Sequence, residues 1–157
     1  MKHPRPTYTL IDELTASASE PMPADVRMHT MTRAYQAMRA IEQDADPERD
    51  DWRVLADCIN MLETLILHGI VADMSGLLHD ATQAMAEAGE RHLRQGLPIR
   101  LSGPGIAAVR AVLEDYAEVT AQVSHRTMVR CHRATEKRIR EVVAGKRKAH
   151  DVEVTAL

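Results

Sequence analysis

The sequence GPGIAAVRAVLEDYAEVTAQVSHRTMVRCHRATEKRIREVVA, residues 103–144, decides the fold class of this 157-residue chain. Its apolar residues recur at alternating steps of three and four, the spacing that keeps side chains on one face of an α-helix. These positions are Ile106, Val109, Leu113, Tyr116, Thr120 and Val123. No proline or further glycine follows Gly105 until Gly145, so the pattern predicts one continuous helix that ends near Ala144.

A second long stretch, residues 48–93, shows the same spacing. It begins at Asp46-Pro47-Glu48, which provides an N-cap acceptor, a proline suited to the first helical turn and an acid near the positive end of the helix dipole. Its apolar positions are Leu55, Ile59, Leu62, Ile66, Ile70, Met74, Leu77, Ala81, Met85 and Ala88. Because glycine costs about 1 kcal/mol relative to alanine inside a helix, Gly69 and Gly76 permit a kink or break near residue 69.

The two stretches are separated by a short connector that contains the stop signal Gly96-Leu97-Pro98 and the start signal Ser102-Gly103-Pro104. Helices of similar length joined in this way fold back on each other, which predicts a long antiparallel helical hairpin. A shorter helix over residues 23–43 packs on it through Met31, Ala34, Met38 and Ile41. The predicted fold is therefore all-α, either a three-helix bundle or a four-helix or larger bundle formed by dimerisation. The aromatic content of 3%, without Phe, agrees because sandwiches and barrels depend on aromatic pairs.

Composition divides the chain into three parts. Residues 1–22, with Pro4, Pro6 and Pro21, predict a flexible N-terminal arm with one short turn near residues 11–14. Residues 23–145 form the helical domain, and residues 146–157 form a basic and then flexible tail. The chain has no apolar run near the roughly 18 residues of a membrane span, and its start lacks the apolar core of a signal peptide. Cys58 and Cys131 form no metal or redox motif, so we expect a reduced, cytoplasmic protein.

The formal net charge of −3 conceals two blocks of opposite sign. Residues 42–70 hold eight acidic and two basic side chains, whereas residues 125–150 hold nine basic and two acidic ones. In the predicted hairpin these blocks meet at one end. Arg133 then faces Glu63, Arg140 lies near Asp57, and Lys146, Arg147 and Lys148 lie beside Asp50 and Asp51. One interpretation is that the blocks neutralise each other, which sets register more than stability because exposed ion pairs contribute about 0–1 kcal/mol each.

The basic block is also a candidate binding site, which we call the basic stripe. Its members are Arg126, Arg130, Arg133, Lys137, Arg140, Lys146, Arg147 and Lys148. An interaction protein would use the stripe to dock a complementary protein partner. A nucleic-acid-binding regulator would place phosphates against the same side chains, with salt-sensitive affinity. The overall acidity and the lack of stacking aromatics, a helix-turn-helix or a zinc finger count against nucleic acid.

The sequence contains weak candidates for metal or acid–base chemistry. His125 and His132 share a helix face, and His68 lies opposite them in the hairpin, but the chain has no ligand pair at the usual helical spacing of three or four. Glu114, Asp115 and Glu118 share a helical turn opposite His79 and Asp80, which leaves a metal- or carboxylate-dependent enzyme in the bundle interior as a third hypothesis. Our expectation is a protein without cofactor or catalytic activity.

Residues 97–139, LPIRLSGPGIAAVRAVLEDYAEVTAQVSHRTMVRCHRATEKRI, resemble a segment of small uncharacterised proteins of proteobacterial phages and integrative elements. The resemblance covers under a third of the chain and carries no defined activity. It implies only a context, namely a bacterial accessory protein that is regulatory or directed at a host system. The leading hypothesis is therefore a homodimeric, non-enzymatic interaction protein that docks a macromolecular partner, such as a host complex, through its charged helix end.

Overall fold

A computed structural model describes residues 5–146, and within them the chain is all-helical, as its sequence predicts. Its elements are α1 (Leu10–Thr15), α2 (Ala24–Gln43), α3 (Arg49–Leu67), α4 (Leu78–Gln95), α5 (Gly103–Gln122) and α6 (His125–Val143). The only extended pairing in this range is an isolated antiparallel bridge between Pro21 and Ser124. No helix in the described range combines the length and the apolarity needed to cross a membrane.

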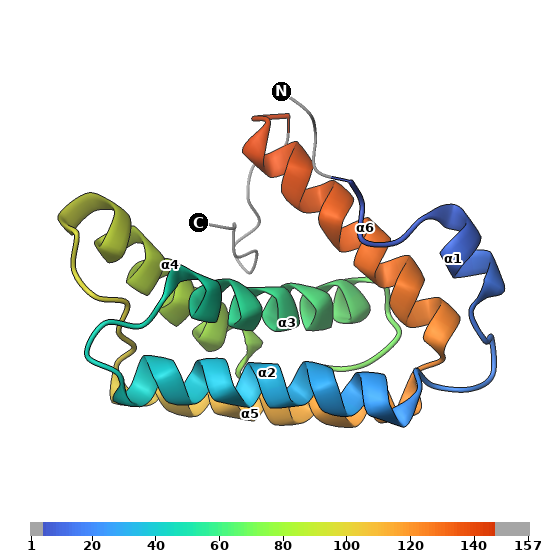
Figure 1. Ribbon diagram of the computed structural model, residues 1–157, viewed down its shortest axis with the longest axis horizontal. Coiled ribbons are helices and arrows are strands. Elements are labelled where there is room, and N and C mark those ends of the chain that lie inside the picture. Colours follow the sequence, from blue (N-terminus) through green and yellow to red (C-terminus); the bar gives the residue numbers. More distant parts are fainter. Residues whose placement is uncertain (1–4, 147–157) are drawn as a thin grey trace.

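Helices α2 to α5 form the body of the molecule. Figure 1 shows α2 and α5 side by side along one edge, with α3 beside them and α4 behind, while α6 leaves the body at an angle. The core is one cluster to which all four body helices contribute, and α6 adds Met128 and Cys131. Trp52 belongs to this cluster and is 1% exposed, and its indole N–H donates to the Met85 carbonyl at 2.9 Å.

The predicted helix over residues 48–93 is divided into α3 and α4. Gly69 and Gly76 adopt left-handed φ angles of 69° and 70°, which non-glycine residues rarely adopt. Asp73 then accepts hydrogen bonds from the N–H groups of Gly76 and Leu78 at the start of α4. The chain reverses between these two glycines, and this allows α4 to pack against α3 instead of extending it.

The expectation of one continuous helix from residue 103 to about 144 is wrong. Val123 and Ser124 are extended, with ψ angles of 139° and 148°, and the Ser124 side chain accepts from the Thr127 N–H as the N-cap of α6. A capping serine can start a new helix without glycine or proline. The far end agrees with the sequence, because α6 ends at Val143 and Gly145 has a φ of 70°. Since both long stretches are divided, the hairpin register that brought Arg133 opposite Glu63 does not form, and Arg138 takes that place.

The N-terminal residues, which we expected to form a flexible arm, lie along α6. We call residues 7–20 the N-terminal strap (Figure 1). Its helix α1 begins with a capping box, in which the Thr9 hydroxyl and the Asp12 carboxylate each accept a backbone N–H of the other residue. At its end, the N–H groups of His125 and Arg126 donate to the carbonyls of Glu20 and Ser17. The expected tail beyond Lys146, which includes Arg147 and Lys148, lies outside the described residues.

Candidate functional site

The first half of the basic stripe is engaged by the strap. Arg126 donates to the carbonyls of Leu14 and Ala16 at 3.0 and 3.2 Å. Arg130 and Arg133 both bind the carboxylate of Glu13, whose side chain is only 11% exposed. The hydrogen bonds from Arg130 and Arg133 lower the pKa of Glu13, so that it carries its charge at neutral pH. These three arginines therefore bind the N-terminal strap, two through the Glu13 carboxylate and Arg126 through backbone carbonyls, and not the acidic block at residues 42–70.

The second half of the stripe remains on the surface. Lys137 is 74% exposed and lies 4.0 Å from Glu141, a distance at which an exposed pair is weak. Arg140 and Lys146 are exposed near the end of α6. Because α6 points away from the body, this end and the arginines at the start of the helix face different surroundings (Figure 1).

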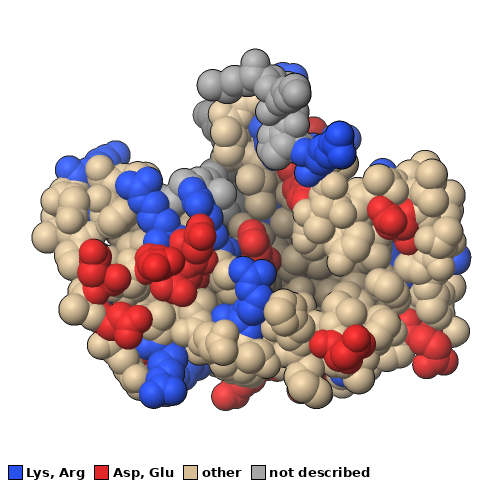
Figure 2. Space-filling view, in the orientation of Figure 1, with Lys and Arg blue, Asp and Glu red and all other residues tan. Residues whose placement is uncertain are grey.

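The acidic block is distributed over several partners. Glu42 binds Arg110 across the α2–α5 contact at 2.6 Å, and Asp50 binds Arg53 within α3. Figure 2 shows acidic side chains gathered over the end of α2 and the start of α3. Among the ion pairs seen in residues 5–146, Glu63 is the only member of the acidic block that pairs with α6, through Arg138 at 2.9 Å. This pair is buried, with side-chain exposures of 1% and 8%.

The weak metal and acid–base candidates are not brought together. His68 caps the end of α3, His125 begins α6, and His132 lies a further two turns along. Residues 5–146 contain no group of three or more His, Cys, Asp or Glu side chains placed to hold a metal ion. Asp115 instead accepts the backbone N–H of Ser75 at 3.0 Å, which ties the α3–α4 loop to α5.

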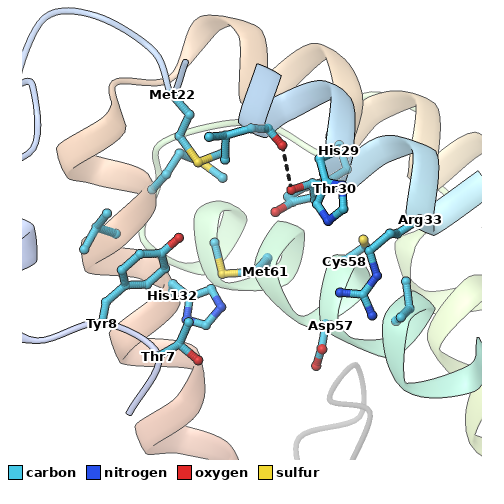
Figure 3. A pocket seen from close by; sticks show the side chains of 15 residues that line it. Thr7, Tyr8, Met22, His29, Thr30, Arg33, Asp57, Cys58, Met61 and His132 are labelled. Atoms are coloured by element: carbon cyan, nitrogen blue, oxygen red, sulfur yellow. Dashed lines mark hydrogen bonds between the residues drawn. The ribbon is translucent and has the colours of Figure 1, made fainter. Parts of the chain in front are cut away.

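A cavity of about 340 Å³, which sequence reasoning missed, opens between α2, α3, α6 and the strap. Figure 2 shows the surface hollowed between α6 and the body. Met22, Met61 and Met128 provide much of its apolar lining, together with valines from α2, α3 and α6. In Figure 3, Tyr8 and His132 lie on the α6 side, while His29, Arg33 and Asp57 lie on the side of α2 and α3. The only sequence signal was the α2 face Val26, Thr30 and Arg33, at steps of four and three.

Charged groups in this cavity are perturbed by their surroundings. Crowding by protein atoms desolvates the Asp57 carboxylate and, with the nearby charge of Glu136, raises its pKa to about 6 against the weaker opposing effect of Arg33. Burial lowers the pKa of His132, so its imidazole is neutral at pH 7. The His132 ring meets Tyr8 edge-on, with centroids 5.1 Å apart. Its Nδ1 lies 3.6 Å from Glu136, beyond hydrogen-bond distance.

Neither cysteine is poised as a nucleophile. Burial raises the pKa of Cys58 to about 12 and that of Cys131 to about 11, so both thiols stay protonated near neutral pH. Both are free and buried. The cavity next to Cys58 is therefore suited to binding, through its charged and apolar groups, more than to thiol chemistry.

Comparison of the chain with protein-family models, with curated proteins and with solved structures finds no match. In residues 5–146 the protein is all-α, with a body of packed helices from which α6 projects.

Proposed function

We propose that this protein is a non-enzymatic interaction protein that docks an acidic surface of a protein partner through the outer end of α6. The observation that carries the proposal is the division of the basic stripe. Arg126, Arg130 and Arg133 are occupied by the strap, whereas Lys137, Arg140 and Lys146 are exposed on a helix that projects from the body. Val143, 70% exposed between them, adds an apolar contact.

The same division disfavours nucleic acid as the partner. A helix that tracks phosphates needs several bases in a row, because affinity grows with the number of phosphates neutralised. Three of the five bases from residue 126 to residue 140 that we assigned to the stripe are turned to the strap, and Glu136 accepts hydrogen bonds from Thr7 beside them. We therefore expect any retention of the protein on a heparin column at low salt to be lost at about 0.15 M salt, where exposed charges are screened over about 8 Å. Retention at that salt concentration would favour the nucleic-acid alternative.

Capture of the partner from the native host tests the proposal. The full chain is used as bait, and each captured protein is identified and then titrated in purified form. We expect binding to weaken as salt is raised, because exposed charges are screened over about 10 Å at 0.1 M ionic strength. We expect binding to be lost in Lys137→Glu/Arg140→Glu. The double variant Arg39→Glu/Arg94→Glu reverses two exposed bases elsewhere and is the matched control.

The result that overturns the proposal is a purified partner bound equally well by Lys137→Glu/Arg140→Glu and by the wild type. Circular dichroism of the variant shows whether a loss of binding reflects the charges or unfolding.

Self-association and an origin in a phage or mobile element belong to the same proposal. Leu10, Ile11 and Leu14 on α1 are 53%, 71% and 61% exposed, which gives the strap an apolar outer side that supports contact with a second copy. Light scattering that gives twice the chain mass of 17.5 kDa supports the dimer, and a monomer contradicts it.

A further inference from the structure

The cavity between α2, α3 and α6 holds two opposite charges that do not neutralise each other. Arg33 on α2 is close enough to influence the Asp57 carboxylate on α3, yet the two side chains form no ion pair. Neither has a hydrogen-bond partner within residues 5–146. Arg33 and Asp57 therefore line the same cavity as separate charged groups, both open to a bound ligand.

The rest of the lining completes a binding site of mixed chemistry. Met22, Met61 and Met128 offer an unbranched, adaptable apolar surface that accepts side chains of different shapes. Tyr8, Tyr116 and His132 add polar atoms around it. A volume of about 340 Å³ lies at the small end of the range for ligand pockets in proteins. A mostly apolar cavity with a few convergent polar groups is the usual form of a small-molecule site.

We propose that this cavity binds a small zwitterion with an apolar side chain, of the chemical class of a free α-amino acid. The ligand's ammonium group would meet Asp57, its carboxylate would meet Arg33, and its side chain would lie on the methionines. A simple amine would leave Arg33 without a partner, and a simple carboxylate would leave Asp57 without one. The inference rests on the cavity alone and is independent of the partner proposed for α6.

Isothermal titration calorimetry with the full chain tests this inference, with L-leucine and L-phenylalanine as probes. Each is compared with a probe that lacks one charge: for leucine these are 3-methylbutylamine, without the carboxylate, and 4-methylpentanoate, without the amine. Because a hydrogen bond to a charged group contributes enough to change affinity tenfold or more, we expect each single-charge analogue to bind at least about tenfold more weakly than leucine.

Variants then locate the binding. Asp57→Asn and Arg33→Gln should each weaken leucine binding by about tenfold or more. Asp80→Asn on α4 and Arg39→Gln on α2 make the same chemical changes on exposed side chains that do not line the cavity, and they should leave it unchanged. Circular dichroism of all four variants confirms that they are folded before titration.

Three results would each overturn the inference. The first is the absence of saturable heat for both amino acids up to about 10 mM, a concentration well above the weakest affinity expected of such a site. The second is equal binding of leucine and of either single-charge analogue. The third is wild-type affinity in both Asp57→Asn and Arg33→Gln.

Discussion

The buried pair between Arg138 and Glu63 offers the sharpest test of how α6 is held on the body. The Arg138 guanidinium donates to Glu63 at 2.9 Å, and both side chains are almost fully enclosed. Replacing Arg138 by Met removes the cation and leaves a carboxylate in the interior. Removing one partner of a buried pair in this way costs about 3–5 kcal/mol, because the remaining carboxylate is shielded from water and has lost its guanidinium partner.

Urea unfolding followed by the fluorescence of Trp52, the only tryptophan, measures this loss. Trp52 lies on α3, the helix that carries Glu63, and is 1% exposed, so its emission reports the core directly. With a denaturant slope of about 2 kcal/mol per molar urea, the midpoint of Arg138→Met should fall by about 1.5–2.5 M. Arg110→Met is the matched control, because Arg110 pairs with Glu42 between helices but is 58% exposed. It should cost about 0–1 kcal/mol.

Two further variants separate charge from packing. Arg138→Lys keeps the charge and loses the planar guanidinium, so its cost should lie between those of the wild type and Arg138→Met. Glu63→Met/Arg138→Met removes both charges and should recover most of the loss, because apolar side chains of similar size replace a buried ion pair well. The reasoning is refuted if Arg138→Met lowers the midpoint no more than Arg110→Met, or if the double variant is as unstable as the single one.

Three more predictions follow from local contacts. A Cβ added at Gly105 would lie 2.9 Å from the Cβ of Ala84, so Gly105→Ala should destabilise the α4–α5 contact by about 1–3 kcal/mol. At Gly103 an added Cβ meets no atom within 4 Å, so Gly103→Ala is the control and should cost little. The urea midpoints of the two variants measure the difference. The pKa of Asp57 is about 6 in the folded protein and 3.8 without perturbation, so the folded state binds more protons between these values and stability falls as pH rises through them. Asp57→Asn should remove this pH dependence and raise the free energy of unfolding at pH 7 by up to about 1 kcal/mol, after allowance for the exposure of Asp57 to the cavity. Urea unfolding of the wild type and of Asp57→Asn at pH 5 and at pH 7 measures this. The prediction is contradicted if the stability difference between the two proteins is the same at both pH values. Glu13→Lys should repel the strap from Arg130 and Arg133 and strengthen retention on heparin relative to the folded wild type. Equal elution of both proteins would show that the strap does not mask the stripe.

The sequence located most helix ends because they depend on neighbouring residues. Pro23 precedes α2, and Ser102 caps α5 by accepting the Gly105 N–H. The start of α3 is displaced by two residues, because its N-cap is Glu48 and not Asp46 as we expected. Gly96 ends α4 in a left-handed conformation. Each signal acts within one helical turn, so it can be read without knowledge of the rest of the chain.

The boundary between α5 and α6 could not be predicted in the same way. Ser124 is a legitimate N-cap, but serine also occurs within helices, and nothing local distinguishes the two uses. The break is supported by distant groups: Pro21 bridges to Ser124, and the N–H groups of His125 and Arg126 donate to Glu20 and Ser17. These contacts fix Ser124, His125 and Arg126 against the strap and Pro21, so α5 does not continue into α6 as one helix.

For the candidate sites, sequence alone determined which charges and apolar faces the chain possesses, and tertiary structure decided which of them meet. The basic stripe was visible as a helical pattern, but its division depends on Glu13, more than 100 positions earlier in the chain. The cavity joins Tyr8, Arg33, Asp57 and His132 from four separate segments. Helical periodicity is a short-range property of the backbone, whereas pairing and enclosure require the chain to return to itself, and that return depends on the breaks after Leu67 and Gln122.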